Sequence, residues 1–171
     1  PKTSNLNELV EIVKKNSANL ALITDPDGDR LALIDEKGKI VIEENTLVLC
    51  IKEYLEKTND TNPIVTNLST TSAVDEVAMQ YNTKVIRTSV GEINVVNGMK
   101  KHNSVIGGEG NGGVILKNSH LGRDAFVASA IILNHLATND LLMSEAIGNI
   151  PKFYMLKEKI EINPEIDAQL I

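Results

Sequence analysis

Hydrophobic residues follow two different periods in the first part of the chain. Between residues 6 and 13 they recur at helical spacing, whereas 20–23 and 31–34 each read LALI, an unbroken apolar run of strand length. The first pattern predicts a helix, and the two runs predict buried strands. The polar segment 25–30 between the runs is therefore expected to be a tight loop that joins two strands.

The rest of the chain alternates between strand and helix patterns. The strands expected are 64–67, 84–88, 104–107, 114–117 and 153–161, after a hairpin over 31–42 that turns at 36–38. The helices expected are 45–57, 72–81, 92–101, 123–137 and 141–149. Strand–helix alternation of this kind requires right-handed crossovers and favours parallel strands. The pattern predicts an α/β fold with mixed, mainly parallel sheets covered by helices, and a domain boundary near residue 43.

Composition narrows the classes of protein. The net charge is −6 and no basic stripe is present, so nucleic acid is not an expected partner. No segment reads as a signal peptide or as an apolar run of membrane length, so no membrane is expected as a partner. The single cysteine, Cys50, excludes a disulfide within the chain and is expected in the core. An aromatic content of 3% leaves Ile, Val, Leu and Ala to build that core, which suits the parallel sheets of a cytoplasmic enzyme.

The loop 25–30 carries the densest charge in the chain. It reads DPDGDR, with Asp25, Asp27 and Asp29 at alternate positions and Arg30 at its end. Three carboxylates this close raise one another's pKa unless a cation neutralises them. Their oxygens are ligands of the kind that Mg²⁺ and Ca²⁺ prefer. A solvated acidic turn is the alternative, but the apolar runs on both sides and the arginine favour a metal site.

Two other motifs match only in part. Counted from Asp25, Glu36 falls at the twelfth position of an EF-hand calcium loop, but Arg30 stands where that loop needs glycine, and the flanks are strands. A calcium-binding protein would also have to prefer Ca²⁺ to Mg²⁺. The segment 108–113 satisfies G-x-G-x-x-G, yet it leads into the strand-like run 114–116 (VIL) where a dinucleotide-binding loop must open a helix.

Three loops, in their order and spacing, resemble those of the α-D-phosphohexomutase family, which comprises phosphoglucomutase, phosphomannomutase and phosphoglucosamine mutase. The segment 25–30 is similar to the magnesium loop DxDGDR of that family. Residues 88–92 (TSVGE) are similar to the loop that touches the phosphosugar in the third domain. Residues 108–112 (GEGNG) are similar to the sugar-recognition loop, usually written GE(M/Q)SG.

The resemblance implies a phosphoryl transfer that relies on magnesium and on positioning. It implies that Asp25, Asp27 and Asp29 hold Mg²⁺, together with a phosphoserine oxygen and water. Arg30 would be the catalytic contact to the phosphate beside the metal, because its fork of donors suits phosphate oxygens. The alternative for Arg30 is an ordinary salt bridge to the acidic loop.

On the sugar side, the resemblance assigns the main contacts to Glu109, which would accept hydrogen bonds from two adjacent hydroxyls. Asn111 would add a second polar contact, in a place where most relatives carry serine. Further contacts to a hexose phosphate are expected at Thr88, Gly91 and Glu92. Several relatives have a histidine with an acid–base role where this chain has Gly113, so that role is not transferred.

Several polar residues keep two interpretations. Glu92 either selects the substrate or serves only the first turn of the helix that it opens. His120 and Arg123 either contact substrate phosphate or act structurally at the start of the next helix. His102 and His135 are expected at the surface or at helix ends.

Two expected segments of the family are missing from these 171 residues. No T-A-S-H-N segment carries a phosphorylated serine, since 69–72 (STTS) reads as an N-cap cluster, and no R-x-S-G-T-E-P loop is present. The resemblance therefore implies an inactive central fragment, in which domains 1 and 4 are missing partners. Its parts would be the end of domain 2 with the metal loop, domain 3 with the sugar loop, and a tail toward domain 4, over 1–43, 44–160 and 161–171. The alternative is a non-catalytic module that binds Mg²⁺ or a phosphosugar.

Overall fold

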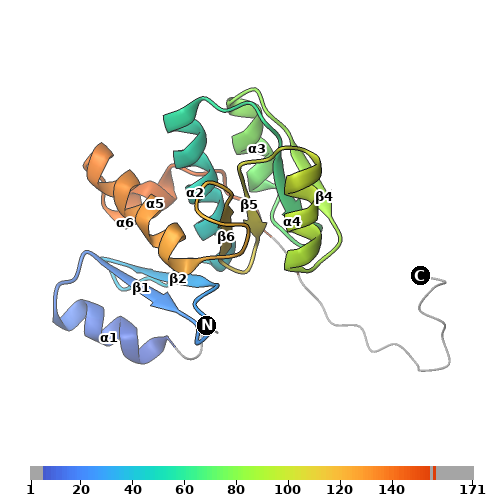
Figure 1. Cartoon of the computed structure of the whole chain (residues 1–171). Coiled ribbons are helices and arrows are strands. Elements are labelled where there is room, and N and C mark those ends of the chain that lie inside the picture. The colour runs from blue at the N-terminus through green and yellow to red at the C-terminus, as the bar shows by residue number, and fades with distance from the viewer. Residues whose placement is uncertain (1–5, 155, 157–171) are drawn as a thin grey trace.

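The computed structural model describes residues 6–154 and 156, which form two sheets with helices packed around them (Figure 1). The smaller sheet is a hairpin of β1 (Leu20–Thr24) and β2 (Leu31–Asp35), joined by the acidic loop as expected. Helix α1 (Asn7–Lys15) covers one face of the hairpin. Because side chains alternate across a strand, Ala32 and Ile34 face α1 whereas Leu31 and Leu33 belong to the main core.

The larger sheet has four strands in the order β4-β3-β5-β6. Its strands are β3 (Ile64–Asn67), β4 (Val85–Thr88), β5 (Ile106–Glu109) and β6 (Gly113–Leu116). β3 runs parallel to β4 and β5, and β6 returns antiparallel to β5. The α/β fold with a mixed, mainly parallel sheet is therefore confirmed. Glycine and β-branched residues fill the short strands, as expected for a sheet covered on both faces.

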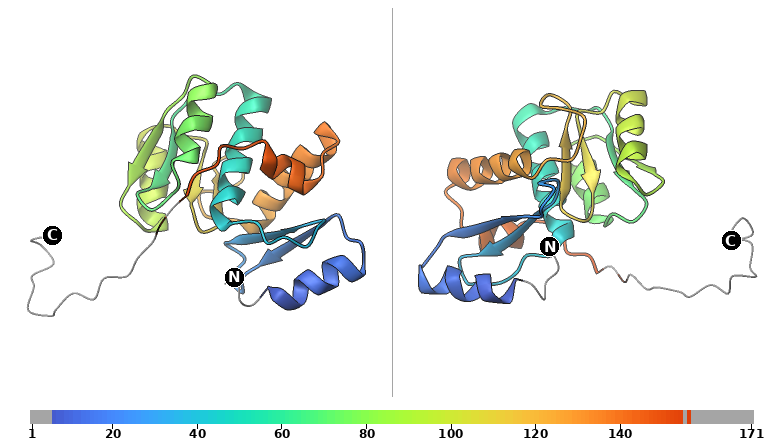
Figure 2. Two further views of the ribbon diagram at one scale, coloured as in Figure 1. Left: turned by 180° about the vertical axis from the view of Figure 1, so that it is seen from behind. Right: turned by 60° about the horizontal axis from the view of Figure 1, so that its bottom comes forward.

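Helices cover both faces of this sheet (Figure 2). They are α2 (Glu43–Thr58), α3 (Ala73–Gln80), α4 (Glu92–Lys101) and α5 (Ala125–Asn139), whereas α6 (Met143–Gly148) packs on α2. Val65 and Ile115 point toward α4, whereas Ile64, Ile106 and Val114 join the core beneath the other helices. Cys50 lies in that core, as expected. None of the helices in the described ranges is long and apolar enough to cross a membrane.

Most elements begin and end within two residues of the expected positions, and two expectations need correction. The turn at 36–38 forms, but its return arm is a single bridge between Ile34 and Ile40 and no full strand. The strand expected over 153–161 is wrong where it can be judged, because 153, 154 and 156 pair with no strand; the remainder of that range lies outside the described residues. An apolar segment forms a stable strand only where it can pair with the edge of a sheet.

The hairpin and the larger sheet share one hydrophobic core. Leu31 and Leu33 pack in the same cluster as residues of α2 and α5, which lie above the hairpin in Figure 1. The backbone N–H of Leu31 donates to the carbonyl of Gly112 at 3.1 Å, and that of Ala125 donates to Gly28 at 3.0 Å. The first bond holds the end of the acidic loop beside the turn that follows β5, and the second ties the loop to the start of α5.

Candidate functional site

The carboxyl ends of three parallel strands bring polar side chains to one edge of the larger sheet. Glu109 ends β5 and is buried, with only 4% of the residue exposed. Its Oε1 accepts hydrogen bonds from Asn67 Nδ2 at 2.7 Å and from the backbone N–H of Gly91 at 3.2 Å. Three separate loops therefore meet at this carboxylate, which is not a solvated side chain.

Hydrogen bonds to the loop after β3 support the turn that follows Glu109. Thr70 Oγ1 accepts from the backbone N–H of Gly110 at 3.1 Å, and Glu44 accepts from that of Thr71 at 2.9 Å. A Cβ atom at Gly110 would lie 2.0 Å from Glu44 Oε2, so a side chain at this position would have to push the Glu44 carboxylate aside. Asn111 accepts from Gly113 N–H at 3.2 Å and donates to Glu109 Oε2 at 3.5 Å.

The loop 88–92 contributes mainly backbone groups. Thr88 Oγ1 donates to backbone carbonyls of Thr66 and Ser89, at 3.4 and 3.0 Å. Gly91 has a φ of +117°, a conformation open to glycine, and this aims its N–H at Glu109. Glu92 opens α4, as one of its two expected roles requires, but its carboxylate also reaches Arg123.

The acidic loop closes on its first aspartate. Asp25 Oδ1 accepts from the backbone N–H groups of Asp29 and Arg30, at 3.2 and 3.3 Å. Burial raises the pKa of Asp25, but hydrogen bonds to the Asp29 carboxyl and to these two amides outweigh it and leave the pKa lowered. The pKa of Asp29 is raised by burial and by the Asp25 carboxyl, against the opposing charges of Arg123 and Arg30.

The donor set fits a hard cation in part. Arg30 Nε lies 3.1 Å from Asp25 Oδ2 and 3.5 Å from Asp29 Oδ1, and thus offsets the charge of both carboxylates. Asp29 Oδ1 is buried and accepts no hydrogen bond from any described residue, which suits a metal ligand. Asp27, in contrast, is exposed, and the three aspartates do not gather their oxygens within 4.8 Å of one another. The structure thus brings together Asp25 and Asp29 but not Asp27.

Arg123 connects these loops. Its guanidinium forms ion pairs with Asp29 Oδ2, with Glu109 Oε2 and, at 3.1 Å, with Glu92 Oε2. Its backbone N–H also donates to Glu92 Oε1 at 3.2 Å, and its side chain is only 14% exposed. The structure therefore shows Arg123 as a bridge among carboxylates, a structural role that extends beyond the helix start, while a contact with substrate phosphate stays a prediction.

Comparison with known families matches two adjoining segments of the chain. Residues 43–154 match "Phosphoglucomutase/phosphomannomutase, alpha/beta/alpha domain III", and residues 1–38 match domain II of the same family. The chain belongs to the phosphoglucomutase/phosphomannomutase family. This phosphohexomutase chain thus contains the end of domain II and domain III, and the resemblance seen in its three loops is confirmed.

Known relatives are considerably longer than this phosphohexomutase chain. A phosphoglucomutase/phosphomannomutase of Thermococcus kodakarensis is 35% identical over 168 residues, which cover 98% of this chain and 37% of the relative. A phosphoglucosamine mutase of Methanococcus maripaludis strain C5 is 30% identical over 175 residues, covering 100% of this chain and 39% of the relative. The crystal structure of a putative phosphomannomutase from Thermus thermophilus has the same fold, with a TM-score of 0.80 at 23% identity over 86% of this chain and 34% of that one.

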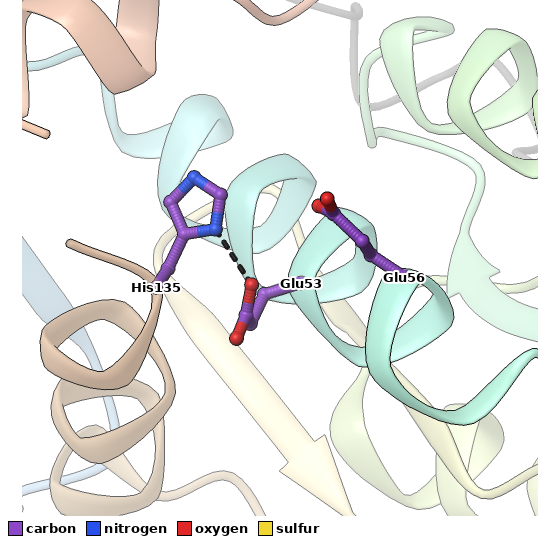
Figure 3. A group of neighbouring side chains, drawn as sticks. All are labelled: Glu53, Glu56 and His135. Carbon is purple, nitrogen blue, oxygen red and sulfur yellow. Dashed lines mark hydrogen bonds and ion pairs between the residues drawn. The ribbon is translucent and has the colours of Figure 1, made fainter. Parts of the chain in front are cut away.

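A second group of ligand-type side chains lies away from the phosphohexomutase loops, between α2 and α5. Glu53, Glu56 and His135 have ligand atoms within 4.8 Å of one another (Figure 3). His135 Nδ1 and Glu53 Oε2 are 2.6 Å apart, and Asn134 Nδ2 donates to Glu53 Oε1 at 2.8 Å. Glu56 is exposed and pairs with Lys52 at 3.1 Å. Glu53 is thus satisfied by protein partners, and the pair with His135 joins two helices.

The histidines and the 69–72 segment differ in how they match the expected positions. A surface position for His135 is wrong, because the residue is only 3% exposed; His102 does end α4. His120 Nε2 lies 2.9 Å from Asp124 Oδ2, and Asp124 is the N-cap of α5, which supports a structural role at the helix start. In the 69–72 segment, Ser72 makes no side-chain cap bond, and Thr71 Oγ1 accepts from Ala73 N–H instead.

Sequence reasoning missed two residues of the site, Asn67 and Glu44. Asn67 is the last residue of β3, and a polar residue at the end of an apolar parallel strand was the available signal. Glu44 had no comparable signal, because a glutamate in the first turn of a helix is ordinary.

Proposed function

We propose that this chain supplies the metal loop and the sugar loop of a phosphohexomutase, an enzyme that interconverts hexose 1-phosphates and 6-phosphates through a phosphoserine and a bisphosphate intermediate. The observation that carries the proposal is that the acidic loop 25–30 and the loop 108–112, which are far apart in the sequence, lie in contact in the structure. Leu31 and Gly112 join them through a backbone hydrogen bond of 3.1 Å, and Arg123 contacts both Asp29 and Glu109. Domains 1 and 4 would complete the site, and the enzyme would be cytoplasmic.

On the phosphate side, Asp25 and Asp29 would hold Mg²⁺ with Asp27 completing the expected set. The ion would supply positive charge against the transferring phosphoryl group. Arg30 keeps 42% of its side chain exposed beside these aspartates, so the outer part of its guanidinium is open to a phosphate. Phosphoryl transfer depends mostly on such positioning and charge stabilisation, which is what this loop offers.

On the sugar side, Glu109 would bind adjacent hydroxyls, with Asn111 beside it and Thr88, Gly91 and Glu92 around the hexose phosphate. Both oxygens of Glu109 already accept hydrogen bonds from the protein. A bound sugar would therefore replace some of these donors with its hydroxyls. A buried carboxylate that loses one donor gains strongly from a new one, which favours recognition of hydroxyl pairs.

The test is a chimera in which this chain replaces the matching third of the Thermococcus kodakarensis relative. We expect mutase turnover of a hexose 1-phosphate by the chimera in a coupled assay, and none by the 171-residue chain alone, which lacks the phosphoserine segment. A folded chimera without turnover would contradict the proposal. If the chain alone still bound Mg²⁺ and glucose 1-phosphate in that case, the non-catalytic module would be the better description.

In the active chimera, Glu109→Gln should lower kcat/KM about tenfold or more, because a charge-assisted hydrogen bond contributes about 1.5–3 kcal/mol and 1.4 kcal/mol corresponds to a factor of ten. Asn111→Ala should cost less, because Asn111 is a neutral partner. Glu76→Gln is the matched control, since Glu76 is exposed on α3 and should leave kcat/KM unchanged. Near-normal kinetics of Glu109→Gln would rule out this loop as the sugar contact.

A further inference from the structure

We infer that Arg123 is a positioning residue that couples the acidic loop to the 109–112 turn, and that it requires Gly113 for its place. The inference rests on the proposed function for what the two loops bind. The contacts that carry it are independent of any ligand. Its consequence is that a change of charge in one loop reaches the other through this side chain, whereas the backbone hydrogen bond between Leu31 and Gly112 only holds the two loops together.

Arg123 binds carboxylates from three separate parts of the fold. Asp29 comes from the loop between β1 and β2, Glu92 from the start of α4, and Glu109 from the end of β5. A guanidinium is a flat, rigid fork of donors, so the three carboxylates cannot move independently while all are bound to it. Three negative charges face this one positive charge. Arg30 also lies beside Asp29, whereas among the described residues Glu92 and Glu109 form their ion pairs with Arg123 alone.

Gly113 leaves the space that the Arg123 side chain occupies. A Cβ atom at this position would lie 2.3 Å from Cδ of Arg123 and 3.1 Å from its Cγ. The backbone around Arg123 is fixed on its carboxyl side, since Asp124 N–H donates to Val114 at 2.9 Å and Ala125 N–H donates to Gly28 at 3.0 Å. The arginine cannot retreat with its backbone, so any side chain at position 113 would displace the guanidinium from its partners.

In a mutase, each of the two loops would bind its ligand at a carboxylate that Arg123 contacts. Asp29 Oδ1 is a buried oxygen without a hydrogen-bond partner among the described residues, and Asp29 Oδ2 is held by Arg123. Glu109 Oε2 is held by the same guanidinium. A cation at Asp29 changes the charge that faces Arg123, and a hydroxyl at Glu109 competes with Arg123 directly. The occupancy of the metal loop and that of the sugar loop are thereby linked.

The experiment follows backbone amide resonances of the ¹⁵N-labelled chain after Asp29→Asn. The reporter is the amide of Gly91, which donates to Glu109 Oε1 at 3.2 Å and forms no hydrogen bond with Asp29 in the described part of the chain. We expect the Gly91 resonance to shift in the Asp29→Asn chain. The same substitution made in an Arg123→Met background should leave it in place, because the connecting side chain is gone.

Two further variants separate this role from general loss of structure. Lys117→Met removes a cation from the end of β6 that pairs with Asn103, and it should leave the transmitted shift intact. Gly113→Ala retains the arginine but displaces it, and it should abolish the shift as Arg123→Met does. Gly113→Ala also replaces Arg123→Met in the test if Arg123→Met fails to fold. Gly113 does not have a positive φ, so alanine adds no backbone strain at this position.

The inference is overturned if Asp29→Asn does not shift the Gly91 amide resonance. It is also overturned if Asp29→Asn shifts this resonance equally in the Arg123→Met or the Gly113→Ala background. These outcomes are independent of mutase activity. An active chimera without transmission would refute the coupling and leave the proposed function standing. Transmission in the chain with an inactive chimera would refute the proposed function and leave the coupling.

Discussion

At the scale of single residues, glycines decide how closely the loops approach. Gly112 has a φ of +87°, and a Cβ atom there would lie 2.5 Å from the carbonyl oxygen of Leu31. Gly28 in the acidic loop has a φ of +70°, but its nearest neighbour would be Phe126 at an ordinary 3.8 Å. Both glycines therefore adopt a positive φ that favours glycine, but only at Gly112 would a side chain also clash with a neighbouring strand.

This difference predicts the outcome of two matched substitutions. Gly28→Ala should lower the free energy of unfolding by about 1 kcal/mol, the cost of a left-handed backbone at a residue with Cβ. Gly112→Ala should lower it by about 3 kcal/mol, because the clash also breaks the hydrogen bond from Leu31. Chemical denaturation of both chains measures the difference. Equal losses would mean that the two loops are not in close contact.

At the scale of elements, α2 and α5 are joined by apolar packing and by one buried polar pair. Glu53 and His135 are 2% and 3% exposed, and each has its partner on the other helix. Buried polar groups of this kind contribute little net stability when paired, but cost much when one partner is removed. The pair thus favours one relative placement of the two helices.

Glu53→Ala should therefore lower the free energy of unfolding by about 1–3 kcal/mol, since it leaves His135 and Asn134 without their acceptor. Glu56→Ala, on the same helix, removes only an exposed ion pair with Lys52 and should change the free energy of unfolding by less than about 0.5 kcal/mol. Urea denaturation of the two variants provides the comparison. A Glu56→Ala loss as large as that of Glu53→Ala would contradict the structural role of the buried pair.

At the scale of the whole molecule, the hairpin and the larger sheet share one core, so they are expected to unfold together. Leu33 of β2 packs in the same cluster as Cys50 of α2. Cys50 is fully buried, its Sγ donates to the carbonyl of Ala128, and burial raises the pKa of its thiol. The thiol therefore reacts with a labelling reagent only after the core opens.

Leu33→Ala creates a cavity in this core and should cost about 2–5 kcal/mol, which corresponds to roughly thirtyfold or more in the rate of Cys50 labelling. Ile12→Ala on α1 is the control, because Ile12 is 54% exposed and should leave the rate unchanged. Thiol labelling under native conditions measures both rates. An unchanged rate in Leu33→Ala would show that the hairpin opens independently of the sheet.

The sequence by itself determined the elements and the two chemistry-bearing loops, because these depend on local patterns. Apolar runs on both sides of 25–30 require strands there, and the aspartates between them can only lie in the connecting loop. The alternation after residue 43 likewise leaves few topologies besides a mainly parallel sheet. The burial of His135 was within reach too, since it follows buried Ala128 and Ile132 at helical spacing.

Only the tertiary structure decided which charges meet. Arg123 pairs with carboxylates 94, 31 and 14 residues away along the chain, and no local pattern encodes such separations. The space at Gly113 and the burial of Glu109 arise in the same way, from the packing of β5, β6 and the acidic loop. Charge interactions depend on distance in space, and that distance is set by how the layers pack.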